Sequence, residues 1–163
     1  MTDKEFFCAQ ISQCEKRMYT LAYGILKNPD DAADAVQDAV IKAYTSLHTL
    51  RSRSQFSPWI LRIVHNTAIS QLRRQADTED LDAQWDLAAQ EHSVDTETKL
   101  TVWDAIQKLR LPYRLVIILF YYDNCSVEQI CKITSTPATV VRQQLTRGRK
   151  MLAAMLNKED FLK

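Results

Sequence analysis

The sequence is poor in glycine, which occurs only twice in 163 residues, as Gly24 and Gly148. Loops that cradle phosphate groups need several closely spaced glycines, so no nucleotide-binding loop of that kind is present. The three histidines form no HExxH pattern, which excludes a common zinc-enzyme motif. These absences argue against an enzyme, and we predict no cofactor and no small-molecule substrate.

Cysteine is scarce as well, and its four copies are poorly spaced for metal binding. Cys8 and Cys14 lie six positions apart, as do Cys125 and Cys131, whereas zinc ligands usually have about two to four residues between them. We therefore predict no metal site and interpret the cysteines as reduced core thiols of a cytoplasmic protein. The first residues are charged and carry no signal-peptide pattern.

Long apolar segments are missing too. The apolar run VIILFYY at 116–122 has only seven residues, whereas a membrane-spanning helix needs about 20. No stretch alternates convincingly between apolar and polar residues, which is the pattern of a β-strand. Apolar residues instead recur at spacings of three and four, so the predicted fold class is all-α.

The net charge is only +1, but it is unevenly distributed. Residues 1–74 contain ten Lys and Arg against seven Asp and Glu, residues 75–98 contain none against eight, and residues 99–163 contain eleven against five. We therefore predict two small helical domains, 1–75 and 99–163, joined by an acidic linker at 76–98. Acidic runs are usually solvated spacers, although this one could also repel DNA or use Trp85 as an anchor in a partner.

Three helices are predicted in the first domain. Periodic apolar residues indicate the first at 4–26. Asn28 as a cap and Pro29 at the first helical position then start a second helix, which runs to about Leu47. A loop at 49–57 leads into the third helix, at 58–74.

The second of these helices is expected to turn an acidic patch outward. The patch consists of Asp34, Gln37, Asp38 and Ile41. Carboxylates repel phosphate, so the patch fits a protein partner with basic side chains better than it fits DNA. The alternative is a plain solvated face with an Asp38–Lys42 pair.

The helix at 58–74 separates apolar side chains from basic ones, although Ile63 and Ile69 break the pattern. Its polar side is suited to nucleic acid because it carries arginine, amide and hydroxyl groups. These residues are Arg62, Asn66, Ser70 and Arg73. For this segment alone, an ordinary surface helix remains the alternative.

The second domain is predicted to contain a helix-turn-helix. Ser126 and Gln129 form a capping-box pattern for a helix that should end near Ile133. After a turn, Pro137 starts another helix, because proline has no N–H to lose at a first helical position. Two further helices are predicted at 100–109 and 112–122.

The helix that starts at Pro137 is expected to read DNA in the major groove. Arg and Gln hydrogen-bond base edges, while Lys and further Arg neutralise phosphates. The outward residues are Thr139, Arg142, Gln143, Thr146, Arg147 and Lys150. Gly148, on the opposite side, indicates close packing between helices. The alternative is a helical hairpin with a solvated basic face.

Three segments together carry a family resemblance: AYGILKNPDDAADAVQDAVIKAY, PWILRIVHNTAISQLRR and SVEQICKITSTPATVVRQQLTRGRKML. They resemble, in this order, the polymerase-binding helix, the minus 10 helix and the minus 35 recognition unit of bacterial RNA polymerase sigma factors of the extracytoplasmic-function (ECF) group. The resemblance covers nearly the whole chain. It implies a factor that binds core RNA polymerase and directs promoter-specific initiation of transcription.

The resemblance also implies roles for particular residues. The acidic patch would meet the clamp helices of the largest polymerase subunit, with the polymerase flap as a further contact, and the last helix would read the minus 35 element. An anti-sigma protein, often membrane-anchored in this group, is a further expected partner. The melted strand of the minus 10 element, with a flipped base in a pocket, would be held by Arg51, Arg53, Phe56, Trp59, Arg62, Asn66, Ser70, Arg73 and Arg74.

The chain departs from the family at several positions. Ser70 stands where the family usually has Asp, so a salt bridge that would orient the neighbouring Arg73 is absent here. In the recognition helix, the commoner Gly, Thr, Ser and Arg are replaced by Thr139, Val140, Gln143 and Gln144, so the family's base preference does not carry over unchanged. Two other functions remain: a sigma-like decoy that binds only an anti-sigma protein, and a free helix-turn-helix repressor, which normally acts as a dimer.

Overall fold

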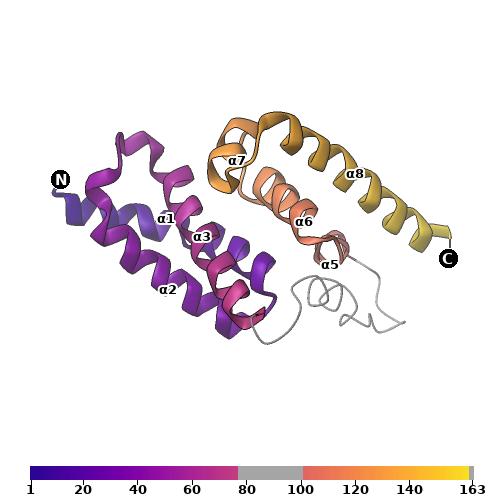
Figure 1. Ribbon diagram of the computed structural model, residues 1–163, viewed down its shortest axis with the longest axis horizontal. Coiled ribbons are helices and arrows are strands. Elements are labelled where there is room, and N and C mark those ends of the chain that lie inside the picture. Colours follow the sequence, from indigo (N-terminus) through magenta and orange to yellow (C-terminus); the bar gives the residue numbers. More distant parts are fainter. Residues whose placement is uncertain (77–100, 162–163) are drawn as a thin grey trace.

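The computed structural model describes residues 1–76 and 101–161, so all but the first residue of the predicted linker at 76–98 lies outside the described residues. Within these two ranges the chain forms seven α-helices, two 3₁₀ turns and one π-helical turn, and no strand. The prediction of an all-α fold is therefore confirmed. The helices form two groups, α1–α3 and α5–α8 (Figure 1). None of the described helices is long and apolar enough to cross a membrane.

The first group consists of α1 (Asp3–Leu26), α2 (Pro29–Thr45) and α3 (Phe56–Ala76). Each of these helices packs against the other two. Helix α2 buries only alanines completely, which lets its neighbours approach closely. The predicted Asn28 cap is confirmed, because its side chain accepts hydrogen bonds from two N–H groups in the first turn of α2.

The boundaries around the loop at 49–57 differ from the predictions. Helix α2 ends at Thr45 rather than near Leu47, and two 3₁₀ turns, η1 (Leu47–Thr49) and η2 (Arg53–Gln55), shape the loop. Helix α3 begins at Phe56, two residues before the predicted start at Pro58. Proline is tolerated there because the N–H groups of a first helical turn have no partner within the helix.

The second group contains α5 (Val102–Gln107), α6 (Leu111–Ile117), η3 (Ile118–Tyr122), α7 (Val127–Thr134) and α8 (Ala138–Phe161). The apolar run at 116–122 was predicted to belong to one helix, but its last five residues form the π-helical turn η3. The capping box of α7 is confirmed. Ser126 Oγ accepts from the N–H of Gln129, and Gln129 Oε1 accepts from the N–H of Ser126.

The turn between α7 and α8 is tight. Ser135 takes the left-handed conformation that ends α7, and the N–H of Val141 donates to the carbonyl of Pro137 at 3.0 Å. The close packing predicted at Gly148 is confirmed, because a Cβ added there would lie 3.1 Å from Cγ1 of Ile117 in α6. The helix-turn-helix is therefore held against α6 through the middle of α8.

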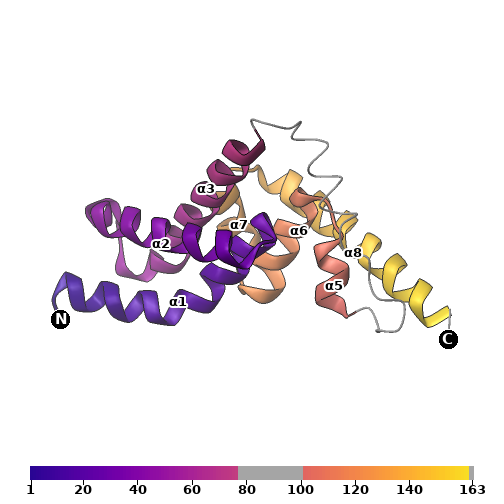
Figure 2. The same ribbon diagram turned by 90° about the horizontal axis from the view of Figure 1, so that it is seen from below.

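The two groups of helices pack against each other. Helix α3 contacts α7, and α1 contacts α6 and η3, as the adjacent ribbons in Figure 2 show. Gly24 of α1 leaves no room for a Cβ beneath Ile118. Ile63 and Ile69, which break the pattern of α3, are half-buried against the core that both groups share. The sequence analysis did not predict this contact between the two groups. The contact explains why Ile63 and Ile69 are apolar although they lie outside the main apolar face of α3.

Candidate DNA and protein interfaces

Helix α2 presents the predicted acidic patch to solvent. Asp34, Gln37 and Asp38 are exposed, and Ile41 is 63% exposed beside them. A single exposed aliphatic side chain is common on soluble proteins, but one with charged neighbours matches the composition of a protein interface, which has an apolar centre and a polar rim. The geometry is that of a small protein-binding face with an apolar centre.

One residue of this face was missed by the sequence analysis. Tyr44 lies one helical turn beyond Ile41 and is 52% exposed, with its ring 5.3 Å from the ring of Phe7. Its spacing of three from Ile41 could have identified it. Lys42 on the same helix turns toward α3, where its ammonium lies 3.4 Å from Oγ1 of Thr67.

Helix α3 carries the predicted polar stripe on its exposed side. Burial lowers the pKa of His65 within this region, and Arg62 and Arg73 lower it further, which outweighs the hydrogen bond to Asn66. The imidazole is therefore neutral at pH 7, and arginines supply the positive charge. The exposed residues of the stripe are Arg62, Asn66, Ser70, Arg73 and Arg74.

Arg51 and Arg53 line an open cavity of about 330 Å³ between η1, η2 and the start of α1. The guanidinium of Arg53 pairs with Oδ1 of Asp3 at 3.1 Å and lies 4.6 Å above the centre of the Phe6 ring. The cavity therefore carries two arginines, and the guanidinium of Arg53 covers the ring of Phe6. Arginine guanidinium groups can hold an unstacked nucleic acid base through stacking and cation–π contacts.

Phe56 is a core residue rather than a DNA contact. Its side chain is 1% exposed, and its ring lies edge-on to Phe6 and Phe7 at centroid distances of 5.7 and 6.0 Å. The sequence analysis assigned Phe56 to the minus 10 surface, and the structure corrects this, because the first turn of α3 directs the ring toward α1. Trp59 is half-buried, with its ring 5.5 Å from Phe56, and keeps some surface open.

Helix α8 exposes all the residues predicted to read DNA. Val141, Leu145 and Gly148 are buried on its opposite side, which fixes the orientation of the reading face. Arg149 points elsewhere, since it donates to Oη of Tyr121 at 2.6 Å and ties α8 to η3. The exposed residues for which the sequence predicts this role are Thr139, Arg142, Gln143, Thr146, Arg147 and Lys150.

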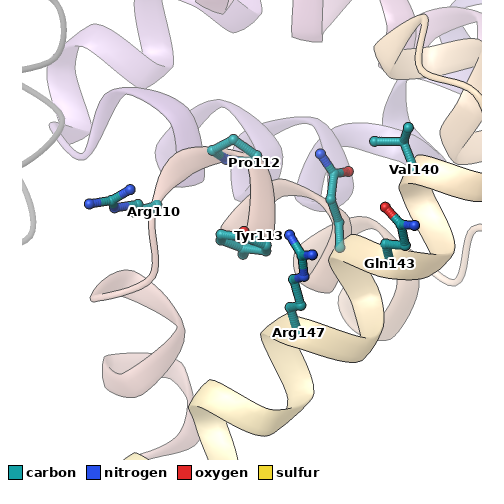
Figure 3. Close-up of a pocket in the computed structure, with 7 residues that line it drawn as sticks. Arg110, Pro112, Tyr113, Val140, Gln143 and Arg147 are labelled. Carbon is teal, nitrogen blue, oxygen red and sulfur yellow. The ribbon is translucent and has the colours of Figure 1, made fainter.

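An open groove of about 360 Å³ runs beside this reading face, between α6 and α8. Figure 3 shows Gln143 and Arg147 on α8, with Arg147 extending toward Tyr113 of α6. Arg110 and Pro112 lie at the other end of the groove. The sequence analysis missed Arg110 and Tyr113, because only folding brings this part of α6 beside the recognition helix.

The cysteines occupy different environments. Cys14 and Cys125 are buried and Cys131 is half-buried, as expected for core thiols, but Cys8 is exposed and was wrongly assigned to the core. All four are free. In residues 1–76 and 101–161, no group of three His, Cys, Asp or Glu side chains is arranged to hold a metal ion.

A helix-turn-helix with an exposed basic face, a second helix with an arginine stripe and an acidic patch with an apolar centre are together typical of a DNA-binding transcription protein. Residues 11–78 match Sigma-70 region 2, and residues 99–152 match Sigma-70, region 4. The chain belongs to the sigma-70 family of RNA polymerase sigma factors, within the ECF group. The family predicted from the three motifs is thus confirmed.

Two relatives from Bacillus subtilis (strain 168) match over almost their full length. RNA polymerase sigma factor SigV is 30% identical over 164 residues, which cover 98% of this chain and 96% of SigV. ECF RNA polymerase sigma factor SigW is 30% identical over 169 residues, which cover 94% of this chain and 90% of SigW. As a sigma factor, the chain binds core RNA polymerase and directs promoter-specific initiation of transcription.

The fold is also similar to that of a solved sigma factor. The sigma factor RpoE from Bartonella quintana, in a co-crystal structure with the anti-sigma factor NepR, superposes with a TM-score of 0.75 at 23% identity. The match covers 93% of this chain and 96% of that chain. It therefore includes helices of both groups.

Proposed function

We propose that each of the three exposed faces has a separate role in promoter-specific initiation. The α2 face binds core polymerase, the α3 stripe with the neighbouring cavity holds the minus 10 element, and the α8 face reads the minus 35 element. One observation carries this proposal. All three faces are exposed on separate helices, while the opposite side of each helix is fixed in the core.

The α2 face contacts the clamp helices of the largest polymerase subunit. Asp34 and Asp38 meet basic side chains there, and Ile41 and Tyr44 fill an apolar centre. A hydrophobic centre with a charged rim is typical of protein interfaces, and aromatic residues contribute disproportionately to their affinity. The polymerase flap is a second contact, made by the C-terminal helices.

The minus 10 face acts on the melted non-template strand. Arg62, Arg73 and Arg74 neutralise phosphates, and Asn66 offers an amide to bases. A flipped base enters the cavity lined by Arg51 and Arg53. Ser70, one turn before Arg73, provides no carboxylate to hold that arginine, which leaves its guanidinium for DNA.

The minus 35 face recognises duplex DNA. Arg142→Ala or Gln143→Ala should each reduce discrimination at the minus 35 element by about 1–3 kcal/mol, because these side chains hydrogen-bond base edges. Fluorescence anisotropy with matched and mutated minus 35 duplexes measures the difference.

Lys150→Ala is the matched control for these two variants. Its ammonium is exposed on the same helix but suits phosphate rather than bases. This variant should weaken binding to all duplexes alike and reduce the salt dependence by about one unit of slope. Unchanged discrimination in both Arg142→Ala and Gln143→Ala would place base recognition elsewhere.

We further propose that the sigma region 2-like domain spans 1–75, the sigma region 4-like domain spans 99–163, and the acidic linker between them acts as a spacer. The chain works in the cytoplasm, together with polymerase and DNA, and needs no cofactor. An anti-sigma protein restrains it, as NepR accompanies the structurally similar RpoE. The exposed α2 face is the surface on which such a partner competes with polymerase.

Run-off transcription tests the proposal. Purified core polymerase and fragments of host genomic DNA are incubated with and without the chain, and the new transcripts are mapped. We expect transcripts that depend on the chain and share minus 10 and minus 35 elements. Absence of both transcripts and core binding would support the decoy function. Tight specific binding of duplex DNA without polymerase would support the repressor.

A further inference from the structure

One arginine beside the reading face of α8 is held in place by aromatic residues of η3. Nε of Arg149 donates a hydrogen bond to Oη of Tyr121 at 2.6 Å. The guanidinium carbon also lies 5.4 Å from the centre of the Phe120 ring and 5.6 Å from the centre of the Tyr121 ring. These contacts restrict a side chain that would otherwise sample many rotamers.

The two rings that hold Arg149 are themselves fixed. Phe120 and Tyr121 lie edge to face, with their ring centroids 5.0 Å apart, which is a preferred arrangement of aromatic pairs. Phe120 is half-buried and packs against the hydrophobic core. The fold of η3 and α8 therefore sets the position of the guanidinium.

Several hydrogen-bond donors of this pair remain available for a ligand. The bond to Tyr121 uses only Nε of Arg149, so both Nη groups keep their protons for another acceptor. The Tyr121 hydroxyl accepts that bond, and its own proton can be donated elsewhere. Both residues are exposed, Tyr121 by 51%. The pair thus offers three donor groups on an open part of the surface.

The positive charge of Arg149 is not neutralised by an acidic side chain. Among residues 1–76 and 101–161, no carboxylate pairs with Arg149, whereas Arg53 shares its charge with Asp3. A guanidinium held by neutral rings keeps its full attraction for an anion. Its planar donor groups match the oxygens of a phosphate particularly well.

The position of Arg149 on α8 places it at the edge of the proposed DNA contact. It follows Arg142 by seven residues, which is close to two helical turns, so both lie on the same side of the helix. It follows Thr139 by ten residues, or about 15 Å along the axis, whereas the major groove is about 12 Å wide. With the first turns of α8 in the groove, Arg149 therefore reaches the sugar-phosphate backbone rather than the bases.

We propose that Arg149 and Tyr121 form a binding site for one backbone phosphate at the edge of the minus 35 element, which we call the phosphate site. The Nη groups of Arg149 and the hydroxyl of Tyr121 donate to the non-bridging oxygens of that phosphate. The inference rests on the proposed role of α8 at the minus 35 element. It adds a contact that fixes the register of α8 on the duplex without reading a base.

Removing the charge of one phosphate at a time tests the phosphate site. The full chain is assembled with core polymerase, and fluorescence anisotropy gives its affinity for promoter duplexes that carry a single uncharged methylphosphonate beside the minus 35 element. We expect the wild type to lose about tenfold in affinity at the positions it contacts. At one of these positions, Arg149→Ala should lose less than about twofold, because its bonds to that phosphate are already absent.

Two milder variants separate phosphate binding from a merely structural contact between α8 and η3. Tyr121→Phe keeps the ring and removes only the hydroxyl, and Arg149→Lys keeps the charge but removes the planar donor group. Each should lose about threefold in affinity and become less sensitive at the same phosphate as Arg149→Ala. A structural contact would change only the thermal stability, which circular dichroism measures. If Arg149→Ala fails to fold, these two variants still decide the matter.

Lys16→Ala is the matched control, since it removes an exposed cation of α1, far from η3 in the sequence. Its sensitivity to methylphosphonates should equal that of the wild type at every position. Arg149→Ala should also lower the salt dependence of binding by about one unit of slope, as expected for one lost phosphate contact. Identical methylphosphonate profiles for the wild type and all three variants of the phosphate site overturn the proposal.

The same measurement distinguishes this inference from the proposed function. A duplex with a mutated minus 35 element should bind the wild-type assembly more weakly than the matched duplex does. If both duplexes bind equally, the proposed role of α8 fails. If the wild type discriminates between them but the variants at Arg149 and Tyr121 keep its methylphosphonate profile, only the phosphate site fails.

Discussion

A chain carrying Asp38→Arg should lose its binding to core RNA polymerase while its fold and its reading of the minus 35 element remain intact. Asp38 is exposed next to Ile41 on α2, where a reversed charge faces the basic partner and cannot be solvated once the surfaces meet. A mispaired interfacial charge costs about 2–5 kcal/mol, which is roughly 30-fold to several thousandfold in Kd. Biolayer interferometry with immobilised core polymerase measures the loss.

Glu15→Arg is the matched control for this variant. It makes the same charge reversal at an exposed position of α1, outside the α2 face. Its Kd for polymerase should stay close to that of the wild type, as is usual for surface substitutions outside an interface. Normal binding of Asp38→Arg would show that the polymerase interface has been assigned to the wrong helix face.

Phe56→Ala should lower the free energy of unfolding by about 3–5 kcal/mol, as large-to-small substitutions of buried aromatic residues do. The ring is 1% exposed and contacts both Phe6 and Phe7, so its removal leaves a cavity between α1 and α3. Urea unfolding followed by circular dichroism measures the change.

Arg62→Ala serves as the comparison, because Arg62 is exposed on the same helix. Its stability should stay within about 0.5 kcal/mol of the wild type while its binding of minus 10 single strands weakens. If Phe56→Ala instead kept its stability and lost only DNA binding, the original assignment of Phe56 to the DNA surface would be right after all.

The features that could be predicted from the sequence are those that depend only on residues within a single helix. Asn28 and Pro29 start α2, and Ser126 with Gln129 starts α7, because capping depends on residues within one helical turn. The exposed faces of α2, α3 and α8 follow from the helical period for the same reason. Such signals are local and need no knowledge of the rest of the fold.

The features that escaped prediction depend on partners far along the chain. Arg17, Lys27 and Arg114 each find a carbonyl at least 80 residues away, and nothing in a helical pattern distinguishes such a cation from a solvated one. Phe56 was misassigned because an aromatic residue among arginines is typical of single-strand binding surfaces. Only the position of α1 shows that the ring is buried.

The hydrogen bonds that Arg17, Lys27 and Arg114 donate between the two groups of helices are accepted by peptide carbonyls, which every residue possesses. Substitutions of the side chains at Gln107 and Asp123 therefore leave the acceptor atoms in place, whereas position 24 must stay small because Ile118 fills the space of a Cβ. Natural variation among related chains would then leave no compensating pairs of substitutions across this contact. Conservation of this contact would then be visible only at the basic positions 17, 27 and 114 and at Gly24.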